Sequence, residues 1–205
     1  MLRRLGVIGC AVALIAVGAA RSPARADNVV NAIAIASGLL VVDALFAEQP
    51  THDEPDFVSI EGGAFDPIRD EKPSTEFGLE YRSGYFLWIF KPFVGAGATT
   101  DGSFWGYGGI RLDTYWDKES RRVVISPSFA IVGYDRGDGK ALGSPVLGRA
   151  GLDFQYRFDN DIRVGVGFHH MSNGKVFGQK NNPGTELVGL TLSVPVTTLM
   201  GLVSE

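Results

Sequence analysis

From residue 57 onward, apolar side chains recur at every second position of the chain. In the segment 146–157, VLGRAGLDFQYR, one face carries Ala150, Leu152, Phe154 and Tyr156, while charged, amide and glycine residues make up the other. A period of two is typical of β-strands, in which successive side chains point to opposite faces. The pattern predicts eight strands, at 57–64, 76–82, 86–96, 104–115, 121–133, 146–157, 162–172 and 185–196.

The polar face of these strands helps to distinguish two all-β architectures. A soluble sandwich turns its apolar face inward, whereas a membrane barrel turns that face toward lipid. Here the polar face combines glycines with charges of both signs, which can pair inside the narrow lumen of an eight-stranded barrel. The charged residues of this face are Glu80, Arg82, Lys91, Arg111, Asp113, Arg149, Asp153, Arg157 and Arg163.

The lengths of the predicted connections between strands also favour a membrane barrel. Long and short connections alternate, as they do between the two sides of outer-membrane barrels. The long ones are 65–75, 97–103, 134–145 and 173–184, and the short ones are 83–85, 116–120 and 158–161. We therefore expect an all-β fold, an eight-stranded antiparallel up-and-down transmembrane β-barrel, with a soluble β-sandwich as the alternative.

The N-terminal residues have the features of a secretory signal peptide. Two arginines precede an apolar run, and Ala24-Arg25-Ala26 offers a cleavage site. The following apolar segment, 28–47, approaches the length of a membrane span but contains Asp43, and it is expected to be flexible or to form a short helix. The predicted organisation is a signal peptide at 1–26, an N-terminal extension at 27–56 and an outer-membrane β-barrel at 57–205.

Charge and cysteine content exclude several classes of function. Cleavage after Ala26 removes Cys10, the only cysteine, so no disulfide or thiol chemistry is expected. It also removes four of the 19 basic residues, which leaves 15 against 23 acidic residues, a net charge of −8. This balance argues against nucleic acid as a partner. The chain has no zinc, calcium, phosphate-loop or dinucleotide motif, and neither a metal nor an organic cofactor is expected.

Three polar residues of the last two predicted strands lie on the face that otherwise points to lipid. His170 and Ser172 end the apolar row of 162–172, and Glu186 begins the row of the following strand. Antiparallel pairing can place Glu186 opposite one of them, with side-chain bases roughly 5 Å apart. Serine, histidine and carboxylate within reach are the parts of a nucleophilic triad, and Asn173 could donate to an oxyanion. Polar residues also occur at a membrane rim without any catalytic role, so the residues alone leave both interpretations open.

The same residues carry a resemblance to a known family. The stretch FHHMSNG, followed by NNPGTE, resembles the signature of the PagL-type lipid A 3-O-deacylases, acyloxyacyl hydrolase-like proteins of the outer membrane. The resemblance extends over residues 57–196. It implies an eight-stranded barrel with a triad facing the lipid leaflet. By this resemblance His170 is the base, Ser172 the nucleophile, Glu186 the orienting acid and Asn173 the oxyanion donor.

We therefore expect an ester hydrolase of the bacterial outer membrane that removes the 3-O-linked hydroxyacyl chain of lipid A, with lipopolysaccharide as its substrate. The alternatives are a non-enzymatic small barrel, an acyltransferase or phospholipase of the same leaflet, and a soluble periplasmic lipid-binding barrel. The sequence leaves open whether the barrel forms a homodimer. One departure from the usual pattern is the ending TTLMGLVSE, since outer-membrane barrels commonly end at an aromatic residue.

Overall fold

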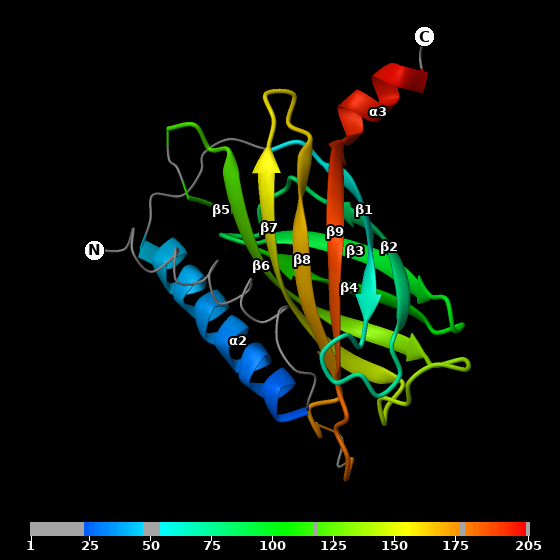
Figure 1. Ribbon diagram of the computed structural model, residues 1–205. Helices are drawn as coiled ribbons and strands as arrows, with labels where there is room; N and C mark the ends of the chain where they lie inside the picture. The colour runs from blue at the N-terminus through cyan, green and yellow to red at the C-terminus, as the bar shows by residue number, and fades with distance from the viewer. Residues whose placement is uncertain (1–22, 47–53, 117–118, 177–178, 204–205) are drawn as a thin grey trace.

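The computed structural model describes residues 23–46, 54–116, 119–176 and 179–203. Within these residues, eight long antiparallel strands surround a filled lumen, one helix lies outside the wall and a second follows the last strand (Figure 1). The helices are α2 (Pro23–Phe46) and α3 (Val196–Val203). The long strands are β1 (Phe57–Phe65), β2 (Ser74–Arg82), β3 (Lys91–Thr99), β4 (Phe104–Arg111), β6 (Val123–Asp135), β7 (Val146–Arg157), β8 (Arg163–Ser172) and β9 (Thr185–Pro195).

The strands form a closed barrel. Each pairs with its neighbour in the sequence, β9 pairs with β1, and the two-residue strand β5 (Thr114–Tyr115) pairs with the start of β6. Closure comes from the pairing of β4 with β6, which joins the two ends of the sheet. A closed ladder satisfies the strands' backbone hydrogen bonds within the wall, as a membrane-spanning structure requires. The predicted fold class is confirmed.

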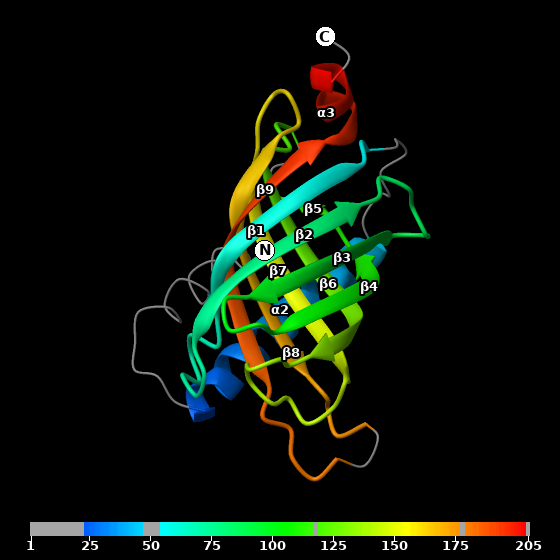
Figure 2. The same cartoon turned by 90° about the vertical axis from the view of Figure 1, so that its right-hand side faces the viewer.

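The barrel has two distinct rims. We call the distal rim the end formed by the connections 66–73, 100–103, 136–145 and 173–184. The opposite, proximal rim holds the start of β1 and the end of β9. Figure 2 shows α3 leaving the barrel at the proximal rim, whereas the 173–184 connection lies at the other end.

The predicted strand at 86–96 is wrong at its start, because β3 begins only at Lys91. Trp88 has a φ of 61°, and a backbone bridge joins Leu87 to Phe90, so this stretch is a turn. The error arises because the apolar run from Tyr85 has the composition of a strand, yet several of its side chains are exposed at the proximal rim. The connection expected at 83–85 therefore covers 83–90, and the long one expected at 97–103 covers only 100–103.

Charged side chains fill the lumen and pair there, as the alternation predicts. Asp113 accepts contacts from Arg163 at 3.0 Å, from Lys91 at 3.3 Å and from Arg111. Farther along the lumen, Arg82 pairs with Asp153 at 2.7 Å. Pairing is necessary because an isolated charge removed from water is strongly destabilising.

Apolar side chains close the lumen near the distal rim. A cluster centred on Phe65, Trp105 and Met171 is almost completely buried there, and Leu187 belongs to it as well. Met171 and Leu187 are sequence neighbours of the predicted triad residues and point to the opposite face of their strands. A substrate therefore has no open route to the triad through the lumen.

The outer wall is apolar, and α2 covers part of it. Where α2 packs on β6, β7 and β8, the outward side chains Ile125, Leu152 and Phe168 are buried against Val29 and Ile33. Elsewhere the outward row is exposed, as at Phe77, Leu79 and Tyr81. Figure 1 shows α2 lying alongside the barrel wall.

Helix α2 is longer than the short helix expected within 28–47. The part from Asp27 to Phe46 is long and apolar enough to cross a membrane, with a mean hydropathy of 2.2, a property it shares with signal sequences. The expected cleavage site after Ala26 lies in the first turn of this helix. The rest of the predicted signal peptide, residues 1–22, lies outside the described residues.

Candidate active site

Strand register brings two of the predicted triad residues together at the distal rim. His170 of β8 lies directly opposite Glu186 of β9. Glu186 Oε1 lies 3.2 Å from His170 Nδ1, a hydrogen-bonding distance. With Nδ1 turned to the carboxylate, Nε2 is the imidazole nitrogen left to exchange a proton.

These two side chains lie on the outer face of the wall. The adjacent residue in β8, His169, points the other way and contacts Glu61 and Asp153 in the lumen at 3.4 Å. His170 therefore shares its face with the outward Val164 and Val166, which are exposed.

Ser172 lies two residues beyond His170 on the same face of β8 and is partly exposed. A strand rises about 3.3 Å per residue, so the two side chains are neighbours along the rim. No hydrogen bond between Ser172 Oγ and His170 is present in the described part of the chain. On the β7 side their cross-strand neighbours are Gly148 and Ala150. These small residues leave room beside the serine for a bulky group.

Asn173, the predicted oxyanion donor, has its amide turned toward the neighbouring loops. Nδ2 donates to the carbonyl oxygens of Leu142 at 2.9 Å and Asn181 at 3.0 Å. Its own N–H donates to Asn182 Oδ1 at 3.0 Å. In this arrangement Asn173 fastens the 173–184 connection to the 136–145 connection, and donation to an oxyanion requires that one of these bonds be exchanged.

Arg69, from the connection between β1 and β2, is the site residue that the sequence did not reveal. Its Nε donates to Glu186 Oε1 at 3.0 Å, and its Nη2 donates to Asp27 Oδ1 of α2 at 2.6 Å. Burial disfavours the charged guanidinium, but these two carboxylates outweigh that effect and raise the pKa of Arg69 above its ordinary value. Nothing in the alternating pattern marks Arg69, because it lies in a loop 117 positions from Glu186.

The backbone of Gly184 closes over the imidazole. Gly184 has a φ of 61°, and a Cβ at this position would lie 2.8 Å from His170 Cε1. Only glycine combines this conformation with so close an approach at little cost.

For the ester hydrolysis that the sequence predicts, we expect Gly184→Ala to lower the rate by about 10-fold to 100-fold, because a small displacement of a catalytic group, here the predicted base His170, has an effect of this order. The control is Gly174→Ala, at a similar φ of 58° in the same connection, whose added Cβ would meet Val176 and not His170. The measurement is the rate of ester hydrolysis by the detergent-solubilised barrel. Equal losses in the two variants would attribute the effect to the loop backbone and not to His170.

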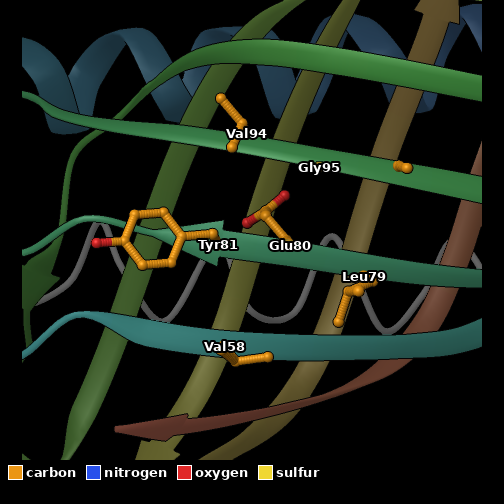
Figure 3. A pocket seen from close by; sticks show the side chains of 7 residues that line it. Val58, Leu79, Glu80, Tyr81, Val94 and Gly95 are labelled. Carbon is orange, nitrogen blue, oxygen red and sulfur yellow. The ribbon is translucent and has the colours of Figure 1, made fainter. Parts of the chain in front are cut away.

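Two surface depressions of the barrel lie away from this site. One, of about 350 Å³, lies on the outer wall between β1, β2 and β3, where Val58, Leu79, Tyr81 and Val94 line it (Figure 3). Val58 and Tyr81 are cross-strand partners near the proximal rim, whereas His170 and Glu186 lie near the distal rim. On the outer wall at the distal rim, His170 and Ser172 are partly exposed and Glu186 is buried beneath them.

No group of three or more histidine, cysteine, aspartate or glutamate side chains suited to a metal ion occurs among the described residues.

Comparison with known proteins gives one family match. A sequence model of the family described as lipid A 3-O-deacylase (PagL) matches residues 74–195, which is β2 through β9. A comparison with curated proteins finds no match.

Solved structures that are similar to the chain include the following three. The crystal structure of the outer membrane enzyme PagL is 18% identical, with a TM-score of 0.51 over 68% of this chain and 99% of that one. A de novo designed transmembrane β-barrel is 10% identical, with a TM-score of 0.48 over 72% and 100% of the two chains. The Yersinia pestis outer membrane protein Ail is 15% identical, with a TM-score of 0.37 over 68% and 99%.

Proposed function

The chain belongs to the lipid A 3-O-deacylase (PagL) family, and we propose that it hydrolyses the ester that links the 3-O-hydroxyacyl chain to lipid A. Its location is the bacterial outer membrane, where the closed barrel spans the bilayer. The substrate, lipid A of lipopolysaccharide, lies in the same membrane.

The observation that carries the proposal is the contact between His170 Nδ1 and Glu186 Oε1 on the outer wall, with Ser172 on the same face. A carboxylate and a histidine on the lipid side of a barrel are energetically costly, because lipid cannot solvate them, and residues of this kind are usually functional. The family to which the chain belongs is named for a deacylase, which agrees with a catalytic role for these residues.

The proposed reaction begins with proton transfer. Ser172 Oγ attacks the ester carbonyl carbon while His170 Nε2 takes the hydroxyl proton, and the resulting imidazolium is oriented and stabilised by Glu186. The tetrahedral intermediate collapses when the 3-oxygen of the sugar leaves and takes the proton from His170. Water, deprotonated by His170, then attacks the acyl-serine, which releases a hydroxy fatty acid and restores Ser172.

An oxyanion donor completes the proposed chemistry. Asn173 follows the nucleophile directly, and its amide could stabilise the charged oxygen. Substrate binding would exchange one of its hydrogen bonds, to Leu142 or to Asn181, for a bond to the oxyanion.

The position of the site matches where its substrate lies. With the start of β1 and the end of β9 at the periplasmic side, the distal rim lies at the outer leaflet. A lipid anchored there can present its ester to Ser172 from the side without leaving the membrane. A filled lumen would exclude so bulky a molecule, which favours the outer face as the place of reaction.

A signal peptide at residues 1–26 fits this destination, and we propose that the mature chain begins at Asp27. The positive start, the apolar run and the Ala-Arg-Ala sequence support cleavage there. The extension 27–56 would then contain most of α2 and lead into the barrel at Phe57.

Mass spectrometry of lipid A tests the proposal. Cells that produce the protein are expected to contain lipid A that lacks one hydroxyacyl chain at the 3-position, together with free 3-hydroxy fatty acid. The protein should be recovered in the outer membrane with heat-modifiable migration, because the ladder of a closed barrel resists detergent. Lipid A of unchanged mass, in cells with correctly assembled barrel, would refute the deacylase function. Transfer of the chain to another lipid would indicate an acyltransferase.

A further inference from the structure

We propose that Arg69 is a positioning residue of the triad, which holds Glu186 in the orientation that His170 requires. The inference rests on the proposed function for the triad and extends it to a residue of another loop. Arg69 Nε lies 3.0 Å from Glu186 Oε1, the same oxygen that lies 3.2 Å from His170 Nδ1.

The burial of Glu186 makes a permanent partner necessary. Its side chain is 0% exposed, and a buried carboxylate is strongly destabilising without a counter-charge or hydrogen bonds. Among the described residues, the side-chain partners of this carboxylate are Arg69 and His170, and Oε2 has no hydrogen-bond partner there. The guanidinium of Arg69 is charged throughout the cycle.

The loop that carries Arg69 is fastened on several sides. Asp66 is completely buried, its N–H donates to the Glu186 carbonyl at 2.7 Å, and its carboxylate pairs with Lys140 at 2.7 Å. One residue before Arg69, Ile68 is buried in the apolar cluster beneath α2. Arg69 therefore projects from a fixed backbone, so the position of its guanidinium can determine the position of Glu186.

The geometry separates positioning from electrostatic assistance. A cation beside Glu186 partly neutralises the charge of its carboxylate. The carboxylate therefore attracts an imidazolium at His170 less strongly. Arg69 instead fixes the direction of Glu186 Oε1. His170 Nδ1 then donates to this oxygen, and His170 Nε2 is left to act on Ser172. Partners that orient a functional group in this way typically change activity by about 10-fold to 100-fold.

Asp27 supplies a control for this inference. It binds the other side of the same guanidinium, through Nη2, and its side chain is 64% exposed. An exposed ion pair contributes little to stability. Loss of Asp27 leaves the bond between Arg69 Nε and Glu186 in place.

The experiment compares Arg69→Met, Arg69→Lys and Asp27→Asn in the full-length barrel, with assembly verified by heat-modifiable migration. Two rates are measured: labelling of Ser172 by a fluorophosphonate probe, and lipid A hydrolysis with kcat and KM determined separately. We expect Arg69→Met to lower both the labelling rate and kcat by about 100-fold with little change in KM. Arg69→Lys should recover part of the loss, and Asp27→Asn should stay within about 3-fold of wild type.

Three outcomes would overturn the inference. Wild-type labelling and kcat in Arg69→Met would show that Glu186 needs no such partner. A higher KM with unchanged kcat would make Arg69 a substrate-binding residue. Equal losses in Asp27→Asn and Arg69→Met would attribute the effect to the docking of α2. If Ser172 is labelled in an Arg69-dependent manner but lipid A is not cleaved, the proposed substrate fails while the positioning role stands.

Discussion

Ser172→Ala is expected to abolish lipid A deacylation, with a fall in kcat of at least about 10⁴-fold, because Ser172 Oγ forms the acyl intermediate in the proposed reaction. His170→Ala should have nearly the same effect, since nucleophile and base act as one unit. Glu186→Ala should be severe but leave more residual activity, because Glu186 orients His170 and exchanges no bond with the substrate. The measurement is lipid A cleavage in detergent micelles.

Ser172→Ala and His170→Ala should assemble, because they remove partly exposed side chains at the rim and leave the backbone ladder intact. Glu186→Ala leaves the guanidinium of Arg69 without its buried partner, so its assembly is checked by heat-modifiable migration before activity is compared. Ser144→Ala is the matched control: Ser144 also lies at the distal rim, where its Oγ accepts a hydrogen bond from the Val146 N–H. It should retain full activity. A folded Ser172→Ala protein with wild-type activity would eliminate the serine mechanism, and full activity in Glu186→Ala would leave that residue outside the triad.

Asp113→Asn is expected to destabilise the barrel by about 3–5 kcal/mol, the effect of removing one partner from a buried ionic network. Asp113 is the shared acid for Lys91, Arg111 and Arg163, and it also accepts a hydrogen bond from Ser126 at 2.7 Å. When a neutral amide replaces this carboxylate, the three cations lie together in the lumen with less negative charge to offset their repulsion. The measurement is the temperature at which the folded, fast-migrating form disappears in detergent.

Asp159→Asn serves as the control for this comparison. Asp159 pairs with Arg122 at 2.6 Å, but its side chain is 87% exposed. Exposed ion pairs contribute about 0–1 kcal/mol, so this variant should unfold close to the wild-type temperature. Similar shifts in the two variants would indicate that the Asp113 network does not stabilise the lumen.

Local periodicity was sufficient to predict most of the barrel. Alternation is a property of neighbouring residues, so it survives without knowledge of distant contacts. It predicted that Arg82, Asp153 and Arg163 would be buried, and they are. It failed from Tyr85 to Phe90, where an apolar run forms a rim turn, because strands and membrane-rim turns use the same aromatic residues.

The candidate site was predictable only in part. The alternation of side chains along β8 and β9 placed His170, Ser172 and Glu186 on one face. It could not determine whether His170 or Ser172 lies opposite Glu186. That choice depends on the register between the strands, which the 173–184 connection sets and which pairs Glu186 with His170.

The sequence by itself determined the barrel, the polarity of its two faces and the three residues that stand out on the outer wall, since each follows from a repeat of two residues. Only the tertiary structure decided what surrounds them: the inward turn of the Asn173 amide, the packing of α2 on the wall and the bond from Arg69 to Glu186. These contacts join loops and elements far apart in the chain. No local pattern encodes them, because they form only when closure of the barrel brings those segments together.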